Sequence, residues 1–331
     1  MLKQISHVRH ALTITATVFA AGSADAQIFS NGSADPTTPA LALVNQTGNN
    51  TPAPGASQWS EVAGASAMVG NALAGVACHL DATDTTGGVR LADDFTVPAG
   101  QRWTLSSVQL FAYQPGANGS AVSAATLRIW SGQPGTAGSS VVFGDATTNR
   151  LTSSTATSAY RVFTTTVGPA IMSPDTSRRI FSVTISADAT LEPGTYWLDW
   201  QLTASTANAP IFAVPVTVTG VRSLTSWNAL QFADGAWRSV LDTGKPEGTT
   251  DAPQDIAFVL AGSVGVACDS IDFNRNSVYP EDQDVIDFFN VLAGAPCPYG
   301  DPCDIDFNNN TVFPEDQDVI DFFTVLAGGT C

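Results

Sequence analysis

The chain is poor in histidine and in basic residues. Its 331 residues include three histidines, and 13 lysines and arginines face 30 aspartates and glutamates, for a net charge of −17. Two of the histidines, His7 and His10, lie near the N-terminus, so a Ser-His-Asp or Cys-His centre elsewhere would depend on His79. Its neighbour Cys78 is poorly placed to face it as a nucleophile. We therefore expect His79 to be structural and do not predict an enzyme.

The low number of basic residues also argues against nucleic-acid binding. An acidic chain without a basic cluster is repelled by phosphate, and no glycine-rich phosphate loop follows a predicted strand.

Long apolar runs are absent as well. No segment reaches the roughly 18 residues of a transmembrane helix, so the sequence predicts no transmembrane segment.

Residues 1–26 have the pattern of a secretory signal peptide. Lys3 and Arg9 precede an apolar run from Ala11 to Ala21, and Ala24-Asp25-Ala26 provides a small-x-small cleavage site before Gln27. The sequence therefore predicts an exported protein, secreted or held at the cell surface.

The central part of the chain predicts a β-sandwich. Residues 27–86 are rich in small and polar residues and predict a low-complexity segment, partly strapped to the body. Residues 87–263 carry short alternating runs separated by Gly/Pro/Asn turns, which is typical of an antiparallel β-sandwich or jelly roll. The clearest runs are LADDFTV, WTLSSVQLFAY, ATLRIW, RIFSVTI, TYWLDWQL, FAVPVTV and IAFVLAG.

The last part of the chain contains a tandem repeat. IDFNRNSVYPEDQDVIDFFNVLAGAPC begins at Ile271, and IDFNNNTVFPEDQDVIDFFTVLAGGTC begins 34 residues later at Ile305. The two copies differ at six of 27 positions. A repeat this close indicates a duplicated structural unit.

Each copy opens with oxygen-bearing side chains at alternate positions, as in an EF-hand loop. In such a loop the first, third and fifth residues offer side-chain oxygens, the seventh offers its carbonyl, and a later acid completes the site. The acid falls at position thirteen here, one residue later than usual. The predicted calcium ligands are Asp272, Asn274, Asn276, Val278 and Asp284 in the first copy, and Asp306, Asn308, Asn310, Val312 and Asp318 in the second. The alternative is a metal-free acidic helical pair, since Asp/Asn-rich turns also form for backbone reasons alone.

A helix is predicted after each loop. In the first copy it begins at Pro280-Glu281-Asp282, and Gly294 ends it. Val285, Ile286, Phe288, Phe289 and Leu292 recur at helical spacing and form one apolar face. Because one loop-helix unit cannot bury this face alone, we expect the two helices to pack together.

These loop-helix units resemble the tandem dockerin module, specifically the Gly/Cys-type dockerin-like tails of secreted bacterial proteins. The resemblance covers residues 268–331 and implies a small all-α calcium-binding domain that docks to a cohesin-like or cell-surface partner. Dockerin loops usually carry Asp and then Gly at positions five and six, where this chain has Asn276-Ser277 and Asn310-Thr311. Fewer carboxylates and a non-glycine residue at the turn predict weak to moderate affinity at the two sites. LADDFTVPAG and LEPGTYWLDW in the body resemble the β-rich region that accompanies such tails, which implies no activity.

Four of the five cysteines flank the repeats. Their placement suggests one disulfide per repeat, Cys268 with Cys297 and Cys303 with Cys331, although four cysteines allow three pairings. A bond closing about thirty residues would contribute about 3 kcal/mol to a domain with little core. Zinc is the alternative, but paired Cys-x-x-Cys ligands are missing. Cys78 is left over and is predicted to be a buried free thiol rather than an intermolecular bridge.

The body offers two kinds of candidate site. Trp197 and Asp199 share one face of a predicted strand, where they would suit carbohydrate binding if exposed and an ordinary core if buried. Trp130, Trp227 and Trp237 have the same two interpretations. A glycosidase would need two facing carboxylates, for which Asp93, Asp94, Glu192 and Asp199 are the candidates.

The sequence thus predicts a secreted, non-enzymatic protein with a β-sandwich body, which is a candidate for carbohydrate binding, and a calcium-dependent docking tail. The alternatives are a polysaccharide-active enzyme that carries such a tail and a purely structural envelope protein.

Overall fold

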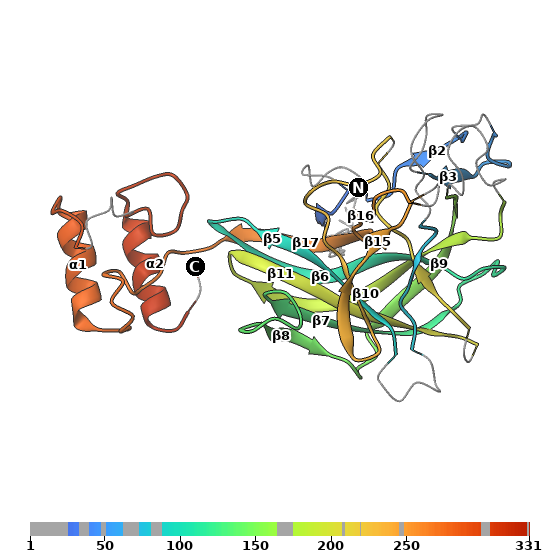
Figure 1. Ribbon diagram of the computed structural model, residues 1–331. Helices are drawn as coiled ribbons and strands as arrows, with labels where there is room; N and C mark the ends of the chain where they lie inside the picture. The colour runs from blue at the N-terminus through green and yellow to red at the C-terminus, as the bar shows by residue number, and fades with distance from the viewer. Residues whose placement is uncertain are drawn as a thin grey trace, which may run out of the picture.

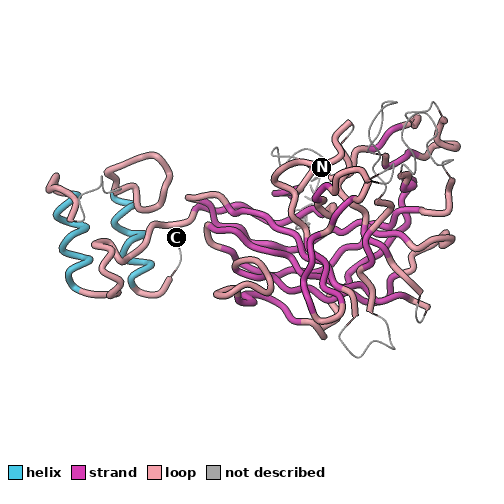
Figure 2. Tube along the Cα trace, in the orientation of Figure 1, coloured by secondary structure: helices cyan, strands magenta, loops and turns pink. Residues whose placement is uncertain are grey.

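The computed structural model describes residues 26–32, 40–47, 51–61, 73–80, 88–163, 175–206, 209–218, 220–244, 248–298, 305–329 and 331. It shows a β-rich body, with two helices from the C-terminal repeats beside it (Figures 1 and 2). The predicted mainly β fold with antiparallel sheets is confirmed. Among these residues, neither helix has the length and apolar character needed to cross a membrane.

The larger sheet has nine strands. Its central path runs β1-β17-β6-β10-β9-β3-β2, and β12 with β4 joins beside β6. All its pairs are antiparallel except β3 with β9. The strands are β1 (Ala26–Ser30), β2 (Leu43–Val44), β3 (Gln58–Ser60), β4 (Val76–Ala77), β6 (Gln101–Tyr113), β9 (Leu151–Arg161), β10 (Arg179–Leu191), β12 (Phe212–Ala213) and β17 (Phe258–Val266).

The second sheet has six strands in the order β14-β13-β5-β11-β7-β8. They are β5 (Arg90–Val97), β7 (Val122–Ser131), β8 (Ser140–Asp145), β11 (Gly194–Ala204), β13 (Leu230–Ala233) and β14 (Ala236–Ser239). A short ribbon pairs β15 (Leu241–Asp242) with β16 (Ala252–Pro253).

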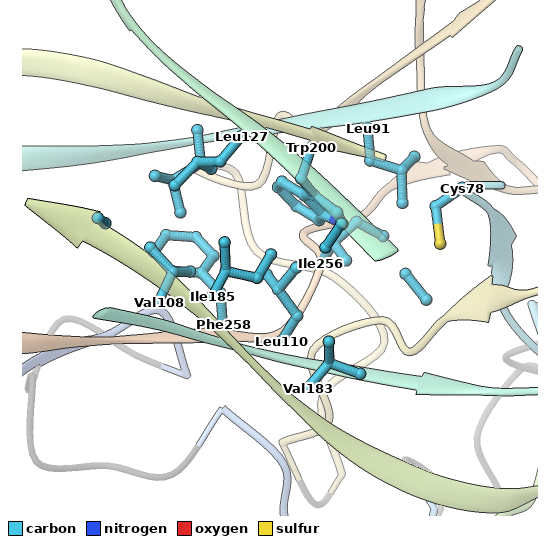
Figure 3. Close-up of a cluster of buried hydrophobic side chains, with 14 of the residues drawn as sticks. Cys78, Leu91, Val108, Leu110, Leu127, Val183, Ile185, Trp200, Ile256 and Phe258 are labelled. Carbon is cyan, nitrogen blue, oxygen red and sulfur yellow. The ribbon is translucent and has the colours of Figure 1, made fainter. Parts of the chain in front are cut away.

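The two larger sheets bury one shared core, which makes the body sandwich-like. Leu110, Ile185 and Phe258 come from the nine-stranded sheet, whereas Leu127 and Trp200 come from the six-stranded sheet, and all are fully or almost fully buried in one cluster (Figure 3). Along β7 and β10 every second residue is buried in this layer, as the period of two requires.

The N-terminal segment is strapped to the body where it is described. β1 pairs with the first part of β17, and the Phe29 ring lies 5.6 Å from that of Phe258. The predicted signal peptide lies outside the described residues apart from Ala26, which begins β1.

The prediction for Cys78 is confirmed, because this thiol is free and buried, and burial raises its pKa to about 12.

The C-terminal repeats form the helices α1 (Asp282–Leu292) and α2 (Asp316–Leu326). Helix α1 begins two residues later than predicted, because Glu281 is its N-cap and forms a capping box with Asp284. Glu315 and Asp318 repeat this arrangement in α2. The predicted packing of the two helices is also confirmed, since Phe288 and Phe322 lie in one buried cluster.

The predicted disulfides, Cys268 with Cys297 and Cys303 with Cys331, are wrong, because Cys268 and Cys331 pair with each other. Cys268 and Cys331 form a disulfide, with their Cα atoms 6.0 Å apart, so the bond joins the start of the first repeat to the end of the second. The sequence suggested one bond within each repeat. The two repeats pack against each other and bring the ends of the tail together, which favours the outer pair. Cys297 is also disulfide-bonded, and Cys303 lies outside the described residues.

The tail meets the body at the end of β17. The Ala267 N–H donates to the Gly100 carbonyl at 3.1 Å, and the Asn309 side chain donates to the Ala267 carbonyl at 2.8 Å. These bonds hold the second loop against the β5–β6 turn.

Candidate functional site

The first loop is ordered by its own side-chain oxygens. Asp272 accepts the Asn276 N–H at 3.0 Å through Oδ1 and the Ser277 N–H at 2.9 Å through Oδ2. Asn274 Oδ1 also accepts the Asn276 N–H at 3.0 Å, and Asn276 Oδ1 accepts the Val278 N–H at 2.6 Å. The residues predicted at positions one, three, five and seven are therefore brought together around one turn.

The second loop repeats this network. Asp306 accepts N–H groups from Asn310 at 2.9 Å and from Thr311 at 2.6 Å. Asn308 and Asn310 accept N–H groups at 3.1 and 2.7 Å, the latter from Val312. Two independent copies of one bonding pattern indicate that the sequence specifies this loop.

Position six of each loop has the left-handed backbone that glycine usually supplies. Ser277 and Thr311 have φ of 66° and 69°. Arg275 and Asn309, two residues earlier, have φ of 57° and 54°. The sharp turn of a calcium loop is thus kept although a side chain is present, at a cost of about 1–2 kcal/mol per residue.

The acid at position thirteen is buried in both copies. Asp284 Oδ1 accepts the Phe273 N–H at 3.0 Å, and Oδ2 accepts the Glu281 N–H at 3.3 Å. In the second copy Asp318 Oδ2 accepts the Glu315 N–H at 3.1 Å, and the Asn308 N–H also interacts with this carboxylate. Burial raises the pKa of Asp318, and the charges of Asp306 and Glu315 add to that effect. A cation would stabilise this carboxylate.

Each loop also holds a glutamate that the sequence analysis did not select. Glu281 Oε1 accepts the Asn274 side-chain amide at 3.1 Å and that of Asn276, and Glu315 accepts the Asn310 amide. These glutamates occupy position ten, and their identical placement in both repeats was the available signal. They add a carboxylate to each loop.

The donor set fits calcium better than a transition metal. Among the described residues, no three His, Cys, Asp or Glu side chains are grouped to hold a metal ion. Calcium is bound by carboxylate, amide and main-chain oxygens together, and each loop offers those groups.

The tail also exposes a repeated set of apolar side chains. Their exposed fractions lie between 39% and 60%, and corresponding residues of the two copies have similar values. The Phe289 and Phe323 rings are 5.9 Å apart, so exposed aromatic side chains of the two helices lie next to each other. We call this set the outer apolar face; it comprises Val278, Tyr279, Ile286, Phe289, Val312, Phe313, Ile320 and Phe323.

In the body, Trp197 and Asp199 are not exposed, so the interpretation of these residues as a carbohydrate-binding surface is wrong. Trp197 is 5% exposed and Asp199 is fully buried, so neither offers a free stacking or bonding surface. Asp199 instead accepts hydrogen bonds from Arg90, Arg128 and Trp130. Sequence analysis missed these arginines, although both lie on strands that flank β11.

The other acidic candidates have different surroundings. Glu192 is exposed and pairs with Arg102 at 2.7 Å. Asp93 is buried and accepts the Ile256 N–H at 2.8 Å, whereas Asp94 lines a cavity of about 380 Å³ together with Asp255. The structure therefore brings Asp94 together with Asp255, which the sequence did not indicate, and does not place Glu192 near either.

Comparisons of the chain with models of known protein families and with curated proteins found no match.

Proposed function

We propose that this is a secreted calcium-binding protein whose C-terminal repeats dock it to another protein. In this proposal residues 268–331 act as a tandem EF-hand-like, dockerin-like module, and a cohesin-like or cell-surface protein is the partner. The β-rich body is the part that is anchored, and it is not an enzyme.

The outer apolar face is the observation that carries the docking proposal. Contiguous exposed apolar surface costs solubility and usually marks an interaction site. Here exposed apolar residues recur at the same positions in both copies, in the loops and on helices whose buried faces already pack together. A tail that served the fold alone would have no need to keep aromatic residues on its outside.

Calcium would be held by the two loops. Asp272, Asn274, Asn276, the Val278 carbonyl and Asp284 supply oxygens in the first copy, with Glu281 as a further carboxylate, and the corresponding residues supply them in the second. The bound ion would offset the acidic charge of each loop and fix the start of the following helix. The proposal is supported by the repeated loop network and by the buried Asp318 carboxylate, which lies near the charges of Asp306 and Glu315.

Calcium titration of the EDTA-treated full-length chain tests the metal step. We expect two binding events by calorimetry and a higher melting temperature of the tail by circular dichroism. If calcium binds nowhere and changes neither helix content nor melting, the proposed module is wrong.

Binding to a panel of cohesin domains tests the docking step. We expect calcium-dependent binding that Phe289→Asp and Phe323→Asp weaken at least about tenfold. Asn290→Asp adds the same charge at an exposed position on α1 and is the matched control. Equal losses of affinity in all three variants would contradict the proposal that the outer apolar face binds the partner.

A second candidate function, polysaccharide hydrolysis, is favoured by the cavity that contains Asp94 and Asp255. Burial raises the pKa of Asp255 to about 7, which suits a general acid, and Trp227 lies in the same wall. If the body hydrolyses polysaccharides, Asp255→Asn will abolish reducing-end release from a substrate panel. No release by the unmodified chain would exclude this candidate.

A further inference from the structure

A second cavity lies on the six-stranded sheet, away from the shared core. Its volume is about 450 Å³, within the range of small-ligand sites. Trp130 and Trp237 pack in a small cluster with Trp197, which is separate from the main core. The side chains that line the cavity come from four strands; they are Arg90, Arg128, Trp130, Phe232 and Trp237, with Gly135 and Gly235 at turns.

The polar part of this cavity is a pair of arginines held by one carboxylate. Asp199 Oδ1 accepts Arg90 Nε at 2.9 Å, and Oδ2 accepts Arg128 Nε at 2.9 Å and Nη2 at 2.6 Å. Trp130 Nε1 donates to the same Oδ2 at 2.9 Å. Because Asp199 is fully buried, its role is to fix the two guanidinium groups rather than to meet a ligand.

Arg90, Arg128 and Asp199 together carry a net positive charge. Two guanidinium ions share one carboxylate, and among the described residues neither arginine has another ion pair. Arg90 is 6% exposed, and burial lowers its pKa, with the charge of Arg128 acting in the same direction. Two partly buried cations that share one carboxylate keep an excess positive charge, which is unfavourable, so the cavity attracts an anion from solvent. The hydrogen bonds of both arginines to Asp199 use Nε and Nη2, which leaves the Nη1 donors for the anion.

The walls of the cavity are aromatic. Arg128 lies over the Trp130 ring, with Cζ 5.0 Å from its centroid, and the Phe232 and Trp237 rings are 5.3 Å apart. Aromatic faces stack on the C–H faces of sugar rings, whereas guanidinium groups bind carboxylate or sulfate in a planar, two-bond geometry. A sugar that bears an oxyanion uses both features.

We propose that this cavity binds an anionic sugar unit, carboxylated or sulfated, of an acidic polysaccharide. Arg90 and Arg128 bind the oxyanion, and Trp130 and Trp237 contact the ring. The proposal specifies the carbohydrate-binding role expected of the body and assigns it to residues other than Trp197 and Asp199. It does not depend on the docking tail, since the cavity and the repeats share no residue.

Calorimetry on the full-length chain in EDTA tests the proposal with three probes: a galacturonate trisaccharide, a sulfated galactose trisaccharide and the neutral galactose trisaccharide. EDTA removes calcium from both the tail and the probes, so failure of docking cannot affect the result. We expect at least one acidic probe to bind at least about tenfold more tightly than the neutral one. The two acidic probes distinguish carboxylate from sulfate.

Variants locate the binding. Arg128→Gln is expected to lower the affinity for the acidic probe about tenfold or more, because one charged donor pair is lost. Trp237→Ala, on the β13–β14 hairpin, is expected to weaken acidic and neutral probes alike. The matched control is Arg238→Gln, which removes the same charge from the neighbouring residue, whose side chain is 60% exposed. It is expected to change affinity less than about twofold.

The proposal is overturned if no acidic probe binds at millimolar concentration, or if acidic and neutral probes bind equally. It is also overturned if Arg128→Gln and Arg238→Gln have the same effect. Melting curves of the variants confirm that each is folded, and Trp237→Ala provides an independent test should Arg128→Gln unfold.

Discussion

Phe288 and Phe322, which occupy the same position in the two repeats, stack face to face. Their ring centroids are 4.2 Å apart, their planes differ by 6°, and both side chains are fully buried. Phe273 and Phe307 pack edge-on against this pair, at 5.4 and 5.2 Å respectively. Each repeat therefore supplies half of one small aromatic core, and a single repeat would leave that core open.

Removing one ring of this pair should destabilise the tail selectively. Phe322→Ala is expected to cost about 3–5 kcal/mol, because it leaves a cavity in a core of few residues. Phe323→Ala is the matched control, since Phe323 is 42% exposed, and it should cost about 1 kcal/mol. Calorimetric melting of the full-length chain would show the tail transition lowered in the first variant. Equal shifts in both would contradict the stacked pair as the centre of the core.

The left-handed backbone at Thr311 predicts a stabilising substitution. Thr311→Gly should raise the stability of the tail by about 0.5–1 kcal/mol, because glycine adopts φ near 69° without a steric penalty. The gain in the folded loop is partly offset by the greater freedom of glycine in the unfolded chain. If calcium binds this loop, its affinity should rise as well.

Asn290→Gly is the opposite control for that experiment. Asn290 is an exposed residue within α1, where glycine should cost several tenths of a kcal/mol through lost helix propensity. Urea denaturation followed by circular dichroism measures both variants. A loss of stability in Thr311→Gly would show that its side chain contributes more than its backbone strain costs.

The Cys268–Cys331 disulfide should be a major source of tail stability. It spans 63 residues, for which chain entropy predicts about 4 kcal/mol. The double variant Cys268→Ser/Cys331→Ser is expected to lower the tail transition strongly and to leave the body transition unchanged. A tail that melts at the same temperature without this bond would show that the aromatic core alone holds the two repeats together.

Sequence reasoning worked best where one periodic pattern determined the local structure. The alternation in WTLSSVQLFAY and TYWLDWQL predicted β6 and β11, and the repeat predicted both helices. FAVPVTV formed no comparable strand, because β12 is limited to Phe212 and Ala213, and the later residues Pro215 and Thr217 make isolated bridges. β9 was missed because LTSSTATSAYR is polar, and its strand depends on neighbours distant in the sequence.

Features that depend on contacts between distant segments could not be predicted. The partner of Cys331 follows from how the two repeats pack, which spacing alone does not determine. In the same way, the partners of Asp199 are set by the pairing of strands. Arg90 lies on β5 and Arg128 on β7, the two strands that flank β11. The ligand oxygens of the loops are close in sequence, so their convergence could be predicted.

The buried acids Asp93 and Asp255 predict that the body loses stability as the pH rises. Burial raises the pKa of both, to about 7 for Asp255, where the charge of nearby Asp94 adds to the effect. A raised pKa means that the folded state holds a proton that the unfolded state, with a pKa near 3.8, has lost. The stability from this proton is present at low pH and is lost between about pH 4 and pH 7.

Asp255→Asn separates this effect from the many carboxylates of the tail. Asparagine stays neutral at every pH, so the variant should lose less body stability as the pH rises than the unmodified body, which should lose a few kcal/mol between pH 5 and pH 8; the loss that is left in the variant comes from Asp93. Urea denaturation of the body transition at both pH values measures the difference. Asp234→Asn, which neutralises an acid whose side chain is 84% exposed, is the control and should show the pH dependence of the unmodified chain. Parallel curves for the unmodified chain and Asp255→Asn would mean that Asp255 is already charged in the folded body.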